Sequence, residues 1–265
     1  ATYIPHAVDT EIFKKIDDNA MVEFRKEHLS NPEKTVFFWN NRNARRKQSG
    51  VLVWWFKEFL DTVGHDKATL IMHTDPKDIH GQDLEHIMNR LELTNGEVML
   101  SKEKISPEQL ALMYNMADCT INIADAEGFG LATLESLACE TPIIVTMTGG
   151  LQEQVTVTDK VTQEVMEERN KTADSVTLYE HGIGIEPSSK SVIGSQEVPY
   201  IYEDRLAKED FLAAMKIFYD LSSAEKKQLG AAGRAHVENN YNFDNYVKQW
   251  DELFVAVHEN CGSWE

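Results

Sequence analysis

Two glutamates flank a pair of glycines at the point where an apolar run gives way to a helical one. Glu127 and Glu135 bracket a turn with Gly128 and Gly130, and residues 119–123 before it predict a buried strand. Glycines at such a turn let backbone amides point at an anion, and a helix N-terminus carries positive partial charge. The stretch therefore predicts a phosphate site whose two carboxylates could accept bonds from neutral hydroxyls, a combination that suits a sugar nucleotide.

Glycines between a strand and a helix can also serve close packing alone, so the turn by itself leaves both interpretations open. The spacing of glutamate, seven residues and a second glutamate resembles the E-x7-E signature of retaining glycosyltransferases with the GT-B fold, particularly the large family 4 class. Glu127 and Glu135 match its two ends. The resemblance implies that Glu135 holds the ribose hydroxyls of a nucleoside-diphosphate sugar. It implies that Glu127, with the backbone of Phe129 and Gly130, binds the sugar.

The same resemblance implies a phosphate seat at the start of the following helix. It would comprise Gly128, the amides of Leu131 and Ala132, and the hydroxyl of Thr133.

A basic cluster follows another predicted strand, residues 35–39. Arg42, Arg45, Arg46 and Lys47 are among only 26 Lys and Arg residues in the chain. Arg42 could clamp phosphate oxygens through two bonds and Lys47 could add a point charge, which would offset the negative charge on a departing diphosphate. A solvated cationic loop is the alternative. Arg42 and Lys47 resemble the family's pyrophosphate-gripping pair, whereas Arg45 and Arg46 match no family position and are assigned to the surface or an accessory role.

Three further segments resemble parts of the same family. The loop with Leu100, Ser101 and Lys102 would meet the nucleobase, and the turn at Gly149 and Gly150 would lie near the transferred sugar. Residues 5–9 resemble the segment that opens the second domain of these enzymes, with Ala7 where glycine is usual. The resemblance therefore implies half of a GT-B architecture, without the N-terminal domain that supplies the acceptor site.

Strands and helices are expected to alternate along residues 35–150, which predicts an α/β fold with a doubly wound, Rossmann-like parallel sheet. Strands are expected at 35–39, 68–73, 97–101, 119–123 and 141–146. Helices are expected at 14–30, 48–63, 82–93 and 107–116, from 131 onward, at 207–221, from Ser222 onward and at 244–258.

One domain is expected over residues 1–258, followed by a tail at 259–265. Residues 155–198 are interpreted as an insertion, with an exposed helix or mobile segment at 155–175 and a stretch rich in Gly, Ser and Pro at 182–198. The insertion could be a lid over the donor, a surface excursion or a partner contact. An edge strand is expected at 198–202, because Pro199 cannot donate to a central ladder.

Composition limits the partners. The formal net charge of −18 disfavours nucleic acid and anionic membrane surfaces, and no apolar run reaches the length of a membrane span. Three cysteines without metal-ligand spacing indicate reduced thiols and a cytosolic location. No cofactor or metal is expected, and the histidines and aspartates at 73–86 fit no known zinc or iron pattern.

The sequence thus predicts a retaining glycosyltransferase domain that binds a nucleotide-sugar donor and transfers the sugar to a glycan or other hydroxyl acceptor. As a fragment it is expected to lack turnover. Two alternatives remain open: a donor-binding module without catalysis, and a GT-B epimerase or phosphorylase. Base, sugar, acceptor and oligomeric state are not specified by the sequence.

Overall fold

The computed structural model describes residues 2–156 and 175–262. Its main sheet has the strand order β3-β2-β1-β4-β5-β7-β6, and all neighbouring strands are parallel except β7 and the edge strand β6, which are antiparallel. The strands are β1 (Thr35–Asn40), β2 (Ala68–His73), β3 (Val98–Ser101), β4 (Cys119–Asn122), β5 (Ile143–Thr146), β6 (Val176–Leu178) and β7 (Gly182–Ile185).

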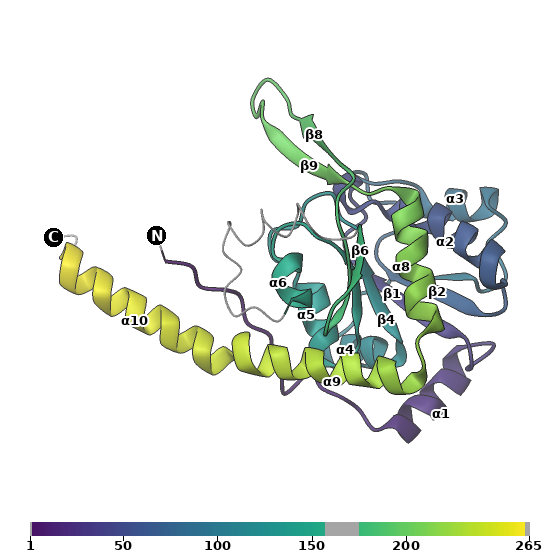
Figure 1. Cartoon of the computed structure of the whole chain (residues 1–265), viewed down its shortest axis with the longest axis horizontal. Helices are drawn as coiled ribbons and strands as arrows, with labels where there is room; N and C mark the ends of the chain where they lie inside the picture. The colour runs from purple at the N-terminus through teal and green to yellow at the C-terminus, as the bar shows by residue number, and fades with distance from the viewer. Residues whose placement is uncertain (1, 157–174, 263–265) are drawn as a thin grey trace.

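Helices cover both faces of this sheet (Figure 1). One face packs against α2 (Ser49–Val63), α3 (Leu84–Arg90) and α8 (Lys208–Asp220). The other packs against α4 (Pro107–Met116), α5 (Leu131–Ala138), α6 (Leu151–Val155) and α9 (Ser223–Asn240), with α1 (Asp18–His28) beside α4.

Alternate residues of a strand point to opposite faces, so a strand covered on both sides must be apolar throughout. In β1, Phe37 and Trp39 enter one core, whereas Val36 and Phe38 enter the other. All four are completely buried. The predicted doubly wound α/β fold is therefore confirmed, and the five predicted strands all exist with small shifts of their ends.

The interpretation of residues 182–198 as a surface excursion is wrong for β7, which lies fully buried beside β5. A β-carbon on Gly182 would lie 2.0 Å from the carbonyl oxygen of Ile143, and one on Gly184 would lie 2.4 Å from the sulfur of Met147. Gly182 thus demands glycine because it meets backbone, whereas a side chain at Gly184 would have to displace the Met147 and Tyr179 side chains. The same two glycines made the strand look like a loop. The expectation for residues 155–175 falls largely on 157–174, outside the described residues.

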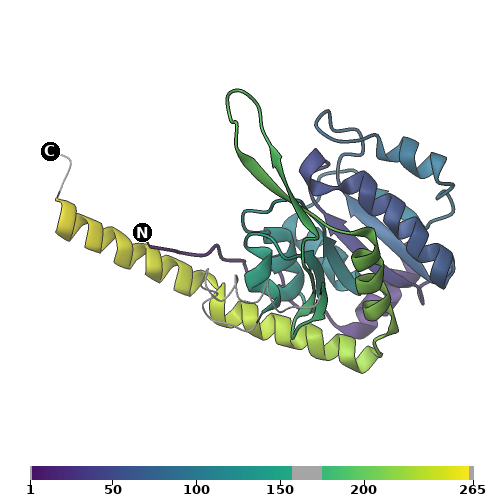
Figure 2. The same ribbon diagram turned by 45° about the horizontal axis from the view of Figure 1, so that its top comes forward.

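The rest of residues 182–198 includes β8 (Ser189–Ile193), which forms a separate hairpin with the following strand β9 (Ile201–Arg205). The strand expected at 198–202 is therefore present from Ile201, but it pairs with β8 and not with the main sheet. Figures 1 and 2 both show this hairpin standing out from the body.

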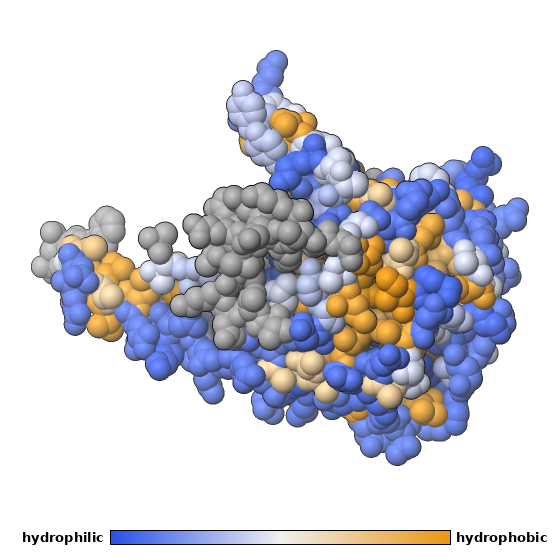
Figure 3. Space-filling view, in the orientation of Figure 1, coloured by the Kyte–Doolittle hydropathy of each residue, from blue (hydrophilic) through white to orange (hydrophobic). Residues whose placement is uncertain are grey.

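The last helix, α10 (Phe243–Cys261), also extends away from the body, and none of its residues is buried. Its predicted aromatic face is present as a row of ring contacts from Phe243 through Tyr246 and Trp250 to Phe254. Figure 3 shows apolar residues on this protruding part. Within the described parts of the chain, no helix has the length and hydropathy needed to cross a bilayer.

Candidate functional site

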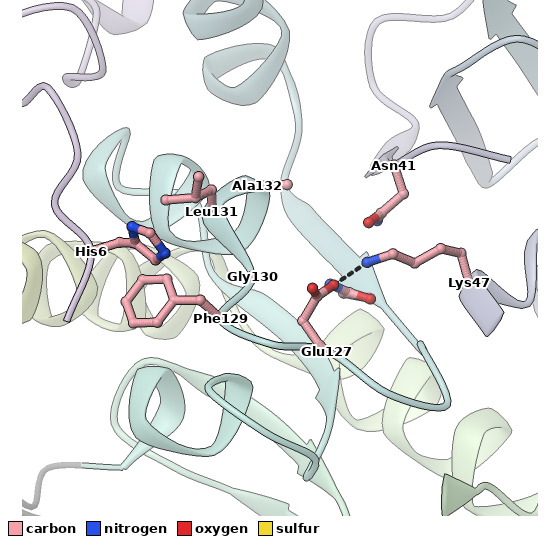
Figure 4. Close-up of a pocket in the computed structure, with 9 residues that line it drawn as sticks. His6, Asn41, Lys47, Glu127, Phe129, Gly130, Leu131 and Ala132 are labelled. Atoms are coloured by element: carbon pink, nitrogen blue, oxygen red, sulfur yellow. Dashed lines mark hydrogen bonds and ion pairs between the residues drawn. The ribbon is translucent and has the colours of Figure 1, made fainter. Parts of the chain in front are cut away.

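The site lies where the order of the strands reverses, between β1 and β4. Loops that leave the carboxyl ends of such strands diverge to opposite faces, which opens a crevice between them. The loop after β1 ends in the short 3-10 helix η1 (Arg45–Lys47), and the loop after β4 carries Glu127. Lys47 Nζ forms an ion pair with Glu127 Oε2 across the crevice (Figure 4). Asn122 Nδ2 donates to the same oxygen at 3.3 Å. The structure thus brings two predicted catalytic residues into contact.

A cavity of about 300 Å³ opens beside this pair. One side is formed by the first turn of α5, which no side chain caps. Gly130 before it has a φ of 91°, a left-handed conformation that suits glycine, and the amides of Leu131 and Ala132 have no acceptor among the described residues. These free donors and the helix dipole favour an anion. The lining residues are His6, Asn41, Lys47, Asn122, Glu127, Phe129, Gly130, Leu131 and Ala132.

Lys47 is the one lysine or arginine among the described residues that line this cavity, and its side chain is only 8% exposed. Burial lowers the pKa of its ammonium, and the adjacent Glu127 carboxylate partly opposes that shift. A buried ammonium held by one carboxylate gains from a second anion, because its other two hydrogens need acceptors. Lys47 is therefore suited to contact a phosphate that enters the cavity.

Two glycines of the turn after β5 support the loop with Glu127. A β-carbon on Gly149 would lie 1.7 Å from the carbonyl oxygen of Glu127, and one on Gly150 would lie 2.7 Å from Phe129 Cα. The Gly150 amide donates to the Gly128 carbonyl at 3.2 Å. Gly149 and Gly150 thus lie directly behind the predicted sugar site and do not line the cavity.

Two other predicted residues occupy different settings at the turn. Gly128 is exposed, and the space around its missing β-carbon is open. Thr133 is completely buried, and its hydroxyl donates to the Gly130 carbonyl at 2.8 Å. Thr133 therefore stabilises the first turn of α5.

Glu135 lies one turn into α5, outside the cavity lining. Its Oε2 accepts from the Tyr114 hydroxyl at 2.8 Å, and that hydroxyl accepts from Asn40 Nδ2 at 2.9 Å. Burial raises the pKa of the Glu135 carboxyl, whereas the bond from Tyr114 lowers it. Its second oxygen has no partner among the described residues, so it is able to accept from a ligand hydroxyl.

Arg42 binds Asp78 and does not line the cavity. Its Nε donates to Asp78 Oδ2 at 2.6 Å and its Nη2 donates to Asp78 Oδ1 at 3.2 Å. The guanidinium, with the His80 amide second, lowers the pKa of the Asp78 carboxyl to about 2. The Arg42 side chain is 63% exposed. It must exchange or share Asp78 before it can contact a ligand.

The predicted nucleobase loop at the end of β3 lies apart from the cavity. β3 is three strand spacings from β4, which corresponds to roughly 14 Å. Ser101 Oγ contacts His73 Nδ1 at 2.9 Å, Lys102 pairs with Glu85, and Leu100 packs on the core. The nucleobase role of these residues remains a prediction.

Sequence reasoning missed three lining residues and the roles of two arginines. Asn41 directly follows β1 and Asn122 is the last residue of β4. His6 packs edge-on against Phe129 with ring centroids 5.1 Å apart (Figure 4). The position of the asparagines at strand ends was the available signal. Arg45 instead pairs with Glu203, and Arg46 donates to the Ala126 carbonyl.

The described residues contain no group of three or more His, Cys, Asp and Glu side chains arranged to hold a metal ion. Two members of the polar cluster at 73–86 have other partners, because Asp78 binds Arg42 and His73 contacts Ser101.

Comparison with known proteins links this chain to one family. The family model described as glycosyl transferases group 1 matches residues 22–178. D-inositol 3-phosphate glycosyltransferase of Corynebacterium jeikeium (strain K411) is 31% identical over 154 residues, which is 56% of this chain and 36% of that protein.

Solved structures share the fold at low identity. Anabaena HepE, solved in complex with UDP and glucose, superimposes with a TM-score of 0.68 at 13% identity, over 96% of this chain and 56% of that one. The C-terminal domain of the group 1 protein LpcC from Francisella tularensis gives a TM-score of 0.60 at 16% identity, over 89% of this chain and 99% of that domain. The chain thus spans about a third of the curated relative and about half of HepE.

Proposed function

The chain belongs to the glycosyl transferases group 1 family, and we propose that it binds the nucleoside-diphosphate-sugar donor of a retaining glycosyl transfer between β1 and β4. The observation that carries this proposal is the buried Lys47–Glu127 pair beside the uncapped start of α5. A diphosphate needs a cation and several N–H donors in one place, and this crevice combines them. HepE, which shares the fold, was solved with UDP.

In the proposed complex the two phosphates lie against the amides of Leu131 and Ala132, and Lys47 bridges Glu127 and a phosphate oxygen. Arg42 releases Asp78 and also binds a phosphate oxygen. During transfer the bond between the sugar C1 and the diphosphate oxygen breaks, and the acceptor hydroxyl oxygen forms a new bond to C1 on the same face. The proton of that hydroxyl passes to the departing diphosphate oxygen. The negative charge that gathers on the leaving diphosphate is stabilised by Lys47, Arg42 and the α5 dipole. Because these groups supply the positive charge, we propose that transfer needs no metal.

We assign the two glutamates to the neutral parts of the donor. Glu127, 12% exposed in its side chain, borders the cavity and can accept from a sugar hydroxyl while it holds Lys47. Glu135 has an oxygen available for a ribose hydroxyl. A carboxylate that accepts from hydroxyls adds specificity, because a ligand without them leaves it unpaired in a partly buried setting.

We further propose that the acceptor binds a second, N-terminal domain and that turnover requires it. The match to the C-terminal domain of LpcC, 99% of which is covered, supports the assignment of this chain to the donor half. The unburied aromatic row on α10 gives that second domain a surface to pack on. The buried, free thiols of Cys119 and Cys139 accord with the cytosolic location that we also propose.

Calorimetric titration tests the donor site. UDP, GDP and ADP are titrated into the chain in turn, each beside its bare nucleoside, and at least one diphosphate is expected to bind. Lys47→Ala should weaken diphosphate binding by about ten- to a hundredfold, because one charge-assisted contact is lost. The affinity for the nucleoside should stay nearly unchanged. Lys190→Ala, which removes an exposed lysine from the hairpin, is the matched control. Equal losses for diphosphate and nucleoside in Lys47→Ala would refute the assignment.

A further inference from the structure

The base of the β8–β9 hairpin lies at the same edge of the sheet as the candidate site. The hairpin leaves the carboxyl end of β7 and returns to the start of α8. Although its far end stands away from the body (Figures 1 and 2), its base is bonded to the loops that follow β1, β4 and β5. These bonds come from three consecutive residues of β9, namely Glu203, Asp204 and Arg205.

Four charged side chains at this base, which we call the root network, bind one another. Glu203 accepts two bonds from Arg45, at 2.6 and 2.9 Å, and one from Arg205 Nη2 at 3.0 Å. Arg205 Nη1 also forms an ion pair with Asp125 Oδ2. Glu203 and Asp125 are each only 3% exposed. Two buried carboxylates are thus balanced by two guanidiniums, and removal of one guanidinium leaves buried negative charge without a full set of donors.

Backbone bonds connect the root network to both halves of the site. The Asp125 amide donates to the Arg46 carbonyl at 2.8 Å, and the Asp125 carbonyl accepts from the Asp204 amide at 2.8 Å. Arg46 Nη1 donates to the Ala126 carbonyl at 2.6 Å. Asp125 is two residues before Glu127, and Arg46 is the residue before Lys47. The hairpin base is therefore bonded to both segments that carry the Lys47–Glu127 pair.

The buried Asp125 carboxylate depends on its hydrogen-bond and ion-pair partners to stay ionised. Burial raises the pKa of its carboxyl, which the bond from Gln48 Nε2 and the charge of Arg205 oppose. Without the guanidinium, the carboxyl would have to take up a proton or move toward water, and either change loosens the loop that it anchors.

We propose that Arg205 and Asp125 are positioning residues of the donor site, and that the β8–β9 hairpin is in this way a structural part of it. Neither side chain lines the cavity. They act by holding the Glu127 loop against η1, so that Lys47 and the start of α5 face one another at the separation a diphosphate needs. The ligand in this proposal rests on the proposed function, whereas the effect on the loop does not.

The experiment compares Arg205→Met, Arg205→Lys and the control Lys190→Met in the full chain. Lys190 is on the same hairpin and pairs with Asp204 at 3.5 Å, but its side chain is 63% exposed and belongs to no buried pair. Amide hydrogen exchange of the peptide spanning 119–131 measures how stably the Glu127 loop is held, and it needs no ligand. Calorimetric titration of UDP, GDP or ADP, each compared with its nucleoside, measures how much the phosphates contribute to binding.

In Arg205→Met we expect faster exchange in 119–131, with the strands β1 to β3 as protected as in the unaltered chain. The diphosphate should bind roughly tenfold more weakly while the nucleoside binds equally well. Arg205→Lys keeps the charge but cannot reach both carboxylates with one ammonium, so we expect both effects to a smaller degree. Lys190→Met should show neither.

Unchanged exchange in 119–131, or equal weakening of diphosphate and nucleoside, would overturn the proposal even if the melting temperature fell. If Arg205→Met does not fold, Arg205→Lys decides by the same two criteria. If the unaltered chain binds none of the three diphosphates, the proposed donor site fails, and the exchange data alone still decide whether Arg205 holds the loop.

Discussion

Lys47 and Glu127 belong to separate loops, yet each is the other's main partner in a nearly buried setting. The sequence identified both because their types and spacing match a family signature and a phosphate-binding turn. It could not show that Arg42 binds Asp78 or that Glu135 contacts Tyr114, because those contacts depend on how segments 36 and 21 residues apart in the sequence come together. The types of the site residues were thus predictable, whereas their partners in the unliganded chain were not.

In the proposed complex Asp78 competes with a phosphate for Arg42, and removal of Asp78 should therefore strengthen diphosphate binding. In Asp78→Ala the exposed guanidinium loses both carboxylate bonds and is free to turn toward the cavity. We expect diphosphate affinity to rise a few-fold in calorimetric titration at low salt, with no gain for the nucleoside. Asp75→Ala, which changes a nearby aspartate without a bond to Arg42, is the control. A loss of diphosphate affinity in Asp78→Ala would contradict the role proposed for Arg42.

The lowered pKa of Lys47 gives diphosphate binding a distinctive pH dependence. A lysine whose folded-state pKa is depressed loses its charge as pH rises through that value, which here lies below the ordinary 10.5. Affinity should accordingly start to fall at a pH below 10.5. Lys47→Arg should retain its affinity through the same range, because a guanidinium stays protonated there. Parallel titrations of both proteins from pH 7 to 10 would test this, and identical curves would argue against contact between Lys47 and the diphosphate.

At the scale of elements, alternating strands and helices were enough to predict the doubly wound sheet. Strands buried on both faces, such as Phe37 to Trp39, are recognisable because every residue is apolar. β7 escaped prediction because Gly182 and Gly184 are present for close packing, which composition alone cannot distinguish from a flexible loop. The hairpin was missed because β8, the strand that pairs with β9, is largely polar and so lacks the apolar pattern of a buried strand.

A substitution at Gly149 tests whether the turn after β5 supports the Glu127 loop. Its φ of 50° and the approach of the Glu127 carbonyl leave no room for a β-carbon. Gly149→Ala should lower the free energy of unfolding by about 1–3 kcal/mol and weaken diphosphate binding, because the Glu127 loop must shift. Gly128→Ala, which enters open space on the same loop, is the matched control. Chemical denaturation and calorimetry of both variants would measure this, and a smaller effect for Gly149→Ala than for its control would be inconsistent with that support.

At the scale of the whole molecule, the core and α10 should contribute very differently to the free energy of unfolding. Phe211 on α8 is completely buried, whereas Phe254 on α10 is 64% exposed. Phe254→Ala should change the free energy of unfolding of this chain by less than about 0.5 kcal/mol. Phe211→Ala should cost about 3–5 kcal/mol. A large loss in Phe254→Ala, measured by urea denaturation, would mean that α10 packs on this domain and is not available to a second one.

The position of a bound diphosphate tests the central claim most directly. Crystals of the chain soaked in turn with UDP, GDP and ADP would show where the two phosphates lie. The account predicts, for at least one of them, phosphate oxygens within hydrogen-bond distance of Lys47 Nζ and of the amides of Leu131 and Ala132. If all three diphosphates left that cavity empty, or bound with their phosphates elsewhere while the Lys47–Glu127 pair stayed closed, the donor-site assignment would be wrong.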